Sequence, residues 1–365
     1  MKVARATPLP RRAAAALPIG GIIAGLHIGS VDAAIEGSMP DSDLPIIDPH
    51  HHLWDFPAVA DRPARTYGLK EFLADAGSGH KIMSSVFVEC LTSYRTDGPD
   101  EMRSLGETEF VAKIADESAS GRHSQTRVAA AIVSHVDLAL GPRAKAVLEA
   151  HIATGNGRVK GIRNASAWDE YPVMGRPLDV RRKDLLMSGD FRSGFAALAP
   201  LGLLFEAWVF HPQLAQVENL AHAFPETSIV LDHLGTPLGV GPYAGQTMVV
   251  FAAWSASIRA LAKAENVKIK LGGLGMPYVG LPQYGRRPEA KVAELADAWR
   301  PYIETCLEAF GPQRCMFESN FPPDGGTCTY GTMWSVFKHI AKNYSADEKR
   351  ALFSGTAAVT YGLAG

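Results

Sequence analysis

One alternation runs through most of this 365-residue chain: a short apolar segment, a polar turn, and a longer segment with helical apolar spacing. It begins at Pro45 and predicts strands at 46–48, 82–89, 127–134, 158–163, 203–210, 228–232, 267–271 and 314–318. Helical segments are expected between them, at 107–117, 141–152, 191–198, 213–223, 252–264, 292–310 and 334–343. Strands that alternate with helices form a parallel sheet through right-handed crossovers, and eight such units close into a (β/α)8 barrel.

The pattern therefore predicts an α/β protein with one TIM-barrel domain at 45–365, preceded by an N-terminal extension at 1–44. A doubly wound open sheet is the alternative fold, but no GxGxxG follows the first strand. In the extension, Arg11-Arg12 precede an apolar, glycine-rich run that is similar to an export signal and too short for a membrane span. A disordered extension is the other interpretation. A cytoplasmic location is favoured, with export as the alternative.

Composition excludes several classes of partner and site. A net charge of −2 gives no electrostatic surface for nucleic acid, so we expect a small-molecule substrate, no nucleic acid and no membrane. Hydrophobic residues make up 47% of the chain, which suits a large buried core. The four cysteines show no CxxC spacing and are expected to be free thiols.

Polar side chains stand where the expected strands end. His50 and His52 end the first strand, and strand alternation directs them to the same side, with His51 pointing away and expected to be structural. Neutral imidazole is the commonest metal ligand, although a histidine-rich turn is the alternative reading. Other strand ends carry Glu89, Arg163, His211 with Gln213, His233, and Asn320 followed by Asp324. Catalytic groups of a barrel lie at this rim, so the convergence indicates an enzyme.

Six motifs in order carry a family resemblance: IIDPHHHLWD at 46–55, FVEC at 87–90, GIR at 161–163, WVFHPQ at 208–213, LDHLG at 231–235 and MFESNFP at 316–322. Together they resemble the amidohydrolase superfamily. Within it they are similar to the TIM-barrel lactone hydrolases, which include 2-pyrone-4,6-dicarboxylate lactonase and the sugar lactonases. The resemblance implies a hydrolase that opens the ring of a small lactone, with an acidic substrate as one option. Non-oxidative decarboxylation of an aromatic acid, or binding without catalysis, are the alternatives.

The same resemblance implies roles for individual residues. His50 and His52 match the first-strand pair and His233 the sixth-strand histidine, and these three are the expected metal ligands, with His211 as the alternative to His233. A catalytic zinc takes about three protein ligands and a water, so zinc is the favoured metal. A metal-free mechanism, in which the histidines polarise the lactone carbonyl, remains the alternative.

Residue 320 departs from the family pattern, because Asn320 stands where the family has an aspartate. An amide is not a general base near neutral pH, so Asn320 is expected to orient a water or to coordinate weakly through its carbonyl. Asp324 is the first candidate for a displaced base, ahead of Glu318 and Glu89, and we expect it to be ionised with a lowered pKa. An Asp before Gly325-Gly326 is equally typical of a turn.

The remaining rim residues are expected to contact substrate: Glu89, Arg163, His211 and Gln213. Arg163 has the bidentate fork that suits a substrate carboxylate, although an arginine at a strand end is as often paired within the protein. His211 has a structural hydrogen bond as its alternative role. The glycines at 272, 273 and 275 are expected to let the backbone approach a packed barrel end or a ligand closely.

Overall fold

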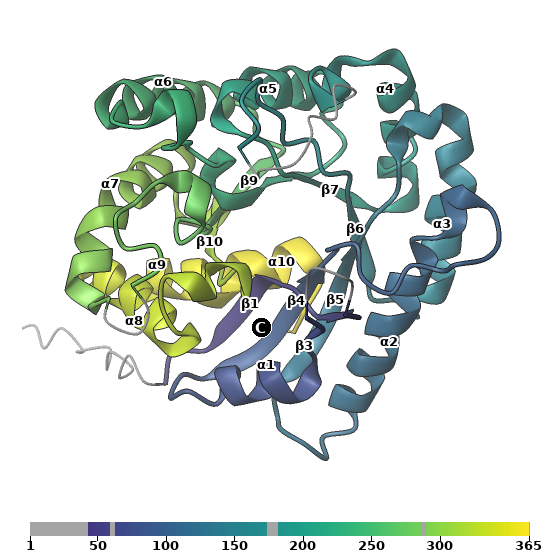
Figure 1. Cartoon of the computed structure of the whole chain (residues 1–365), viewed down its shortest axis with the longest axis horizontal. Coiled ribbons are helices and arrows are strands. Elements are labelled where there is room, and N and C mark those ends of the chain that lie inside the picture. Colours follow the sequence, from purple (N-terminus) through teal and green to yellow (C-terminus); the bar gives the residue numbers. More distant parts are fainter. Residues whose placement is uncertain (1–42, 59–62, 174–181, 287–289, 365) are drawn as a thin grey trace, which may run out of the picture. The chain divides into compact units, whose positions relative to one another are not determined.

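Eight parallel strands form the centre of the computed structural model, which describes residues 43–58, 63–173, 182–286 and 290–364. Their order in the sheet follows the sequence: β1 (Ile46–His51), β4 (Ile82–Val88), β5 (Arg127–Ser134), β6 (Val159–Arg163), β7 (Leu204–Ala207), β8 (Ile229–Leu231), β9 (Val267–Leu271) and β10 (Cys315–Phe317). Helices surround these strands (Figure 1). The predicted TIM barrel is confirmed, while residues 1–42 of the expected extension lie outside the described residues.

Helices follow the strands largely as expected. The α-helices are α1 (Leu69–Ala76), α2 (Leu105–Ala119), α3 (Ala144–Thr154), α4 (Gly189–Phe195), α5 (Leu214–Ala223), α6 (Thr247–Leu261), α7 (Val292–Phe310), α8 (Tyr330–Ile340), α9 (Ala346–Arg350) and α10 (Thr356–Tyr361). Among the described residues, no helix combines the length and the apolar character needed to cross a bilayer. Cys90, Cys306 and Cys315 are free thiols, as expected.

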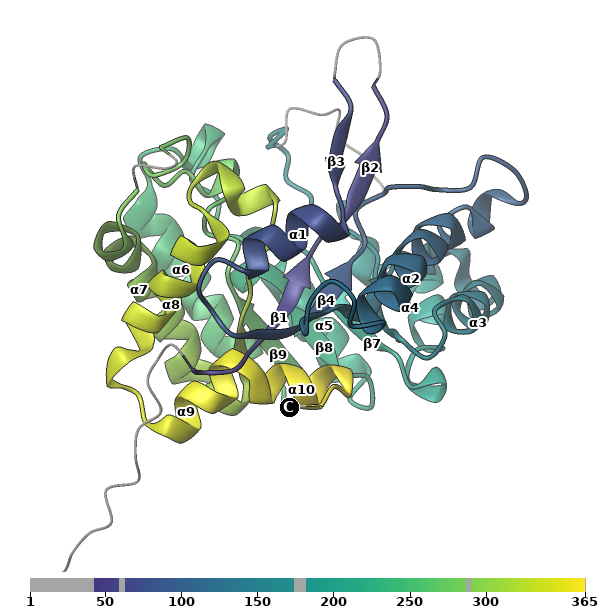
Figure 2. The ribbon, with the colours of Figure 1, turned by 90° about the horizontal axis from the view of Figure 1, so that it is seen from below.

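The sequence did not predict α1, α9, α10 or the antiparallel hairpin of β2 (Trp54–Phe56) and β3 (Arg65–Tyr67). Figure 2 shows this hairpin standing out from one end of the barrel, with α10 at the opposite end. The expected strand at 203–210 was too long, because β7 ends at Ala207. Beyond it, the backbone N–H of Phe210 donates to Gln213 Oε1 at 3.2 Å, which turns the chain into α5.

Contacts between β1 and the segment after β10 close the barrel. His51 and Phe321 form a parallel bridge, the Asn320 N–H donates to the His50 carbonyl at 2.9 Å, and the His52 N–H donates to the Phe321 carbonyl at 2.8 Å. Behind them, the buried Asp48 carboxylate accepts from the backbone N–H (3.0 Å) and hydroxyl (2.6 Å) of Ser319. The closure places the first-strand histidines beside the end of the last strand.

Alternation along the strands separates two apolar layers. One set of buried side chains packs between strands and helices, among them Phe87, Ile132, Phe205 and Phe317. A second set fills the barrel interior with Ile47, Val86, Val133, Val230, Met316 and, from α10, Tyr361. The interior is thus apolar near α10, and the polar side chains collect toward the end where the strands finish.

Candidate active site

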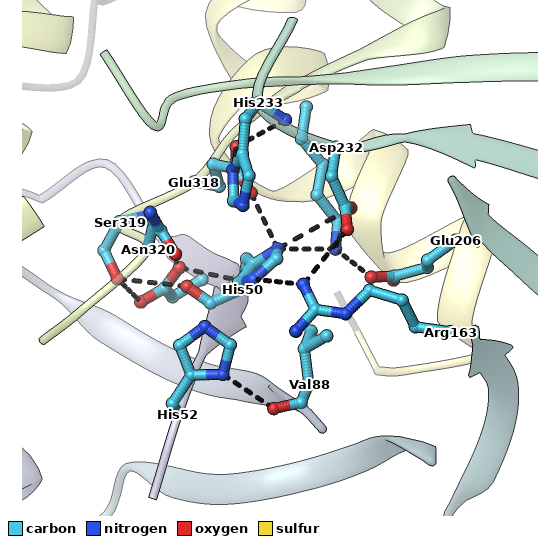
Figure 3. Close-up of polar contacts among 12 residues, drawn as sticks. His50, His52, Val88, Arg163, Glu206, Asp232, His233, Glu318, Ser319 and Asn320 are labelled. Carbon is cyan, nitrogen blue, oxygen red and sulfur yellow. Dashed lines mark hydrogen bonds and ion pairs between the residues drawn. The ribbon is translucent and has the colours of Figure 1, made fainter. Parts of the chain in front are cut away.

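The first-strand histidines lie in the barrel as the alternation predicts. His50 is fully buried and its ring centroid is 5.0 Å from that of His52 and 4.5 Å from that of His233. His52 Nδ1 lies 2.8 Å from the Val88 carbonyl oxygen, so Nδ1 carries the proton, and Figure 3 shows the other ring nitrogen directed toward His50. His51 faces away, within 2.9 Å of the Ser85 hydroxyl, which fits a structural role.

His233 and Glu318 form a hydrogen-bonded pair at the ends of β8 and β10. Glu318 Oε1 accepts from His233 Nδ1 at 2.7 Å and from the His233 backbone N–H at 3.1 Å. Burial raises the pKa of Glu318, but His233, which donates a hydrogen bond to it, is the largest of the opposing influences that together lower the pKa to about 2. Glu318 is therefore an anion that orients the His233 ring (Figure 3).

The backbone that presents His233 has an uncommon conformation. His233 has a φ of 54°, in the left-handed region that non-glycine residues rarely adopt, and Asn320 has a φ of 48°. A Cβ at Gly273 would lie 2.6 Å from His233 Cβ, and one at Gly272 would lie 2.4 Å from Glu318 Cγ. These two glycines provide the close approach that the sequence suggested, and here the approach is to site residues.

A buried ammonium lies beside His50. Lys270, in β9, has no exposed surface, and its Nζ is 3.1 Å from His50 Nδ1, 2.7 Å from Glu206 Oε2 and 3.3 Å from Asp232 Oδ1. Burial lowers the pKa of Lys270, but Asp232 and Glu206 outweigh it and raise the pKa above its usual value. Burial and the Lys270 ammonium together lower the pKa of His50, so its imidazole stays neutral.

Arg163 is paired inside the protein. Its Nε donates to Glu89 Oε1 at 2.8 Å, its Nη2 donates to the Glu89 carbonyl, and its Nη1 donates to Asp232 Oδ2 at 3.3 Å. Arg163 is 4% exposed and Glu89 is 2% exposed. The structure thus favours the paired role that the sequence left open, since the fork expected to hold a substrate carboxylate is used by Glu89 and Asp232.

Two groups of three described residues have ligand atoms within 4.8 Å of one another: His50, His233 and Glu318, and His50, Glu206 and Asp232. His52 joins neither group. Glu318 Oε2 lies 2.9 Å from His50 Nδ1, yet it makes no hydrogen bond with the described residues. This carboxylate oxygen is buried and accepts no hydrogen bond from the part of the chain that the structure describes. Together with the two imidazoles it forms a set of ligands that fits a divalent cation.

Asn320 and Asp324 lie together, but in a setting that differs from the expected one. Asn320 Nδ2 donates to Asp324 Oδ1 at 3.2 Å, and Asp324 Oδ2 has no hydrogen-bond partner among the described residues. Burial and the Glu318 charge raise the pKa of Asp324 well above its usual range, opposite to the lowered pKa that we expected. The sequence could not predict that Asp324 is fully buried, because an Asp in a loop of this composition is normally exposed to solvent.

His211 and Gln213 lie in the turn between β7 and α5. The Gln213 amide is used by the loop backbone: Oε1 accepts from the N–H of Trp168 and Phe210, and Nε2 donates to the Ser166 carbonyl. His211 Nδ1 accepts from the Leu238 N–H at 3.3 Å, the structural bond named as its alternative role. The structure does not bring either residue into hydrogen-bond contact with the His50 cluster.

The sequence reasoning missed Lys270 and Glu206 as members of the site. A signal was present in both strands, because Lys270 lies between Ile269 and Leu271 and Glu206 lies between Phe205 and Ala207. The flanking side chains pack toward the helices, so alternation directs both charges into the barrel.

A family model described as Amidohydrolase matches residues 47–363. The chain belongs to the amidohydrolase family. This amidohydrolase is 30% identical over 88% of its length to protein y4mH of Sinorhizobium fredii, of which 99% is covered. It is 29% identical over 87% of its length to the L-fucono-1,5-lactonase of Burkholderia multivorans, with 96% of that protein covered.

Solved structures agree with this assignment. A Burkholderia multivorans amidohydrolase is 26% identical, with TM-scores of 0.65 in a HEPES complex and 0.64 in a zinc complex, covering 87% of this chain and 99% of that one. Two more distant structures show a similar fold. A probable 2-pyrone-4,6-dicarboxylic acid hydrolase of Acinetobacter baumannii is 15% identical with a TM-score of 0.58, and the match covers 87% of this chain and 99% of that one. A 5-carboxyvanillate decarboxylase of Novosphingobium aromaticivorans is 14% identical with a TM-score of 0.54, and the match covers 89% of this chain and 100% of that one. The predicted family is confirmed, and the protein is an enzyme.

Proposed function

We propose that this amidohydrolase hydrolyses a small lactone, most simply a sugar 1,5-lactone, to the open hydroxy acid. The observation that carries the proposal is the convergence of His50, His233 and Glu318 at the rim where barrel enzymes catalyse. The nearly full-length similarity to an L-fucono-1,5-lactonase supports a sugar lactone as the substrate class. Decarboxylation receives no comparable support, because the decarboxylase structure is 14% identical and shows the fold alone.

A divalent metal, with zinc favoured, would be held by His50, His233 and Glu318, with His52 beside them as a further ligand. The similar Burkholderia multivorans structure contains zinc. When bound, the metal supplies Lewis-acid polarisation of the lactone carbonyl and lowers the pKa of water. The neutral His50 and the ionised Glu318 are the protonation states that such a cation requires.

The chain's own residues hold these donors in position. Glu318 fixes the His233 ring through Nδ1, so Nε2 is the nitrogen left for a ligand, and the Val88 carbonyl does the same for His52. In the reaction a water oxygen adds to the carbonyl carbon, the ring C–O bond breaks, and the departing oxygen takes a proton to give a hydroxy acid. Because Arg163 is held by Glu89 and Asp232, we do not assign it a substrate contact.

The test is proton release from a panel of sugar 1,5- and 1,4-lactones, including L-fucono-1,5-lactone, with carbon dioxide release from aromatic acids measured in parallel. Hydrolysis of at least one lactone well above the spontaneous rate is the expected result. The Glu318→Gln variant should lose metal and activity together, whereas Glu308→Gln, at an exposed ion pair on α7, should lose neither. Carbon dioxide release without lactone opening would replace the proposal with the decarboxylase alternative.

A further inference from the structure

The second group of potential metal ligands, His50, Glu206 and Asp232, surrounds a side chain of the protein itself. The Lys270 ammonium lies within 3.3 Å of one atom from each of the three. All four residues are fully buried. Nζ is in hydrogen-bond contact with His50 Nδ1 and Glu206 Oε2, and it forms an ion pair with Asp232 Oδ1. Groups of the protein itself therefore surround the ammonium.

We propose that Lys270 is a permanent internal cation that fills the second cation position of this site, so that the barrel binds one exchangeable divalent metal and Lys270 holds His50 in place for it. Lys270 is a positioning residue in this account. The single divalent metal is the one of the proposed function above, whereas the identity of the substrate does not enter.

Charge balance supports the assignment. Buried carboxylates without a partner cation are strongly unfavourable, and Glu206 Oε2 and Asp232 Oδ1 lie 2.7 and 3.3 Å from Nζ. Asp232 Oδ2 is paired separately with Arg163 at 3.3 Å. A second divalent ion would have to displace an ammonium that is covalently attached and cannot leave the barrel.

The ammonium is in turn held from the opposite end of the barrel. Tyr361, in α10, donates its hydroxyl to Glu206 Oε1, and the Lys270 Nζ lies 5.7 Å from the centroid of the Tyr361 ring. The contacts therefore run from α10 through Glu206 and Lys270 to His50. This support explains why the two charges in the middle of β7 and β9 keep a defined geometry in a fully buried interior.

The first measurement is the number of Zn²⁺ or Mn²⁺ ions bound per wild-type chain, by metal analysis after equilibrium dialysis. One ion is expected, and two would overturn the proposal whatever the variants do. The Lys270→Ala variant lacks the three outer carbons and the ammonium of the lysine, which together have the size and charge of propylammonium. The space that they leave is lined by His50, Glu206 and Asp232. We expect this variant, purified with propylammonium, to show a raised thermal midpoint and at least tenfold recovery of activity, and to bind a second metal when the amine is absent.

Controls separate this role from simple loss of packing. Lys270→Met fills the space without charge, so propylammonium and a second metal should have no effect on it. In case that variant does not fold, the double variant Lys270→Met with Glu206→Gln replaces both members of the buried pair and should behave in the same way. Lys268→Ala, two residues earlier on β9, should bind one metal and ignore the amine. A folded Lys270→Ala protein with one metal and no response to propylammonium would refute the proposal.

Discussion

Replacing Arg163 with methionine should destabilise the fold far more than its position at a strand end suggests. The change removes the cation from the buried Glu89 carboxylate, 2.8 Å from the guanidinium and 2% exposed, and one of the two cations beside the buried Asp232, which keeps Lys270. Breaking such a buried pair costs about 3–5 kcal/mol. For a barrel of this size that corresponds to a thermal midpoint lower by roughly 4–8 °C.

The assay is a thermal shift measured beside a matched arginine from the same part of the chain. Arg158 immediately precedes β6, and its ion pair with Asp116 at 2.6 Å is half open to solvent, with Asp116 59% exposed. Arg158→Met should therefore cost no more than about 1 kcal/mol. Adding Glu89→Gln to Arg163→Met should recover part of the loss, because one unpaired buried charge disappears. Equal shifts for Arg163→Met and Arg158→Met would refute the buried-pair reasoning.

Four further predictions follow from the same contacts. His233→Ala should keep its far-UV circular dichroism yet lose at least about 10²-fold in kcat/KM, and an unfolded variant would contradict its placement as a site residue. Asn320→Asp should tighten metal binding in a calorimetric titration, because it adds a carboxylate at a residue whose backbone N–H bonds the His50 carbonyl, and unchanged affinity would count against Asn320 as a neighbour of the metal. Asp324→Asn should fold and keep most of the rate, because burial and the Glu318 charge raise the pKa of Asp324 and so disfavour the ionised form that a general base needs, whereas near inactivity would restore it as the general base. His151 is buried between Ser104 and Thr108, and burial lowers its pKa to about 3. The free energy of unfolding should therefore fall as the pH drops from about 6.5 toward 3, and His151→Gln should flatten that slope by up to about 1.4 kcal/mol per pH unit. Equal slopes for the two proteins would contradict a neutral buried ring.

The sequence predicted the barrel well because its evidence is local and repeated. Each strand is an apolar run short enough to be told from a helix, and α7 was predicted with its observed bounds, Val292–Phe310. Strand alternation also placed His50 and His52 together correctly, since it depends only on backbone geometry. The β2–β3 hairpin was not predicted, because three-residue strands carry too little periodicity to be recognised.

The sequence predicted many of the residues that form the site, but not which of them pair with each other. Arg163 and Glu89 were both found at strand ends, yet their pairing depends on β4 and β6 being two strands apart in the sheet, a contact between distant positions. Burial was the other missing quantity, and it decides the raised pKa of Asp324 and the internal role of Lys270. The left-handed backbone at His233 likewise depends on glycines from a neighbouring strand end rather than on its own sequence.

The central claim is that His50, His233 and Glu318 hold one divalent metal that this amidohydrolase uses to open a lactone ring. The most direct test titrates zinc into chelator-treated enzyme while the initial rate of proton release from L-fucono-1,5-lactone and related sugar lactones is followed. The account predicts a rate that rises linearly and levels off at one equivalent of zinc per chain, with no rise in Glu318→Gln. A full rate in enzyme shown to be free of metal, or a rate that keeps rising to two equivalents, would contradict it.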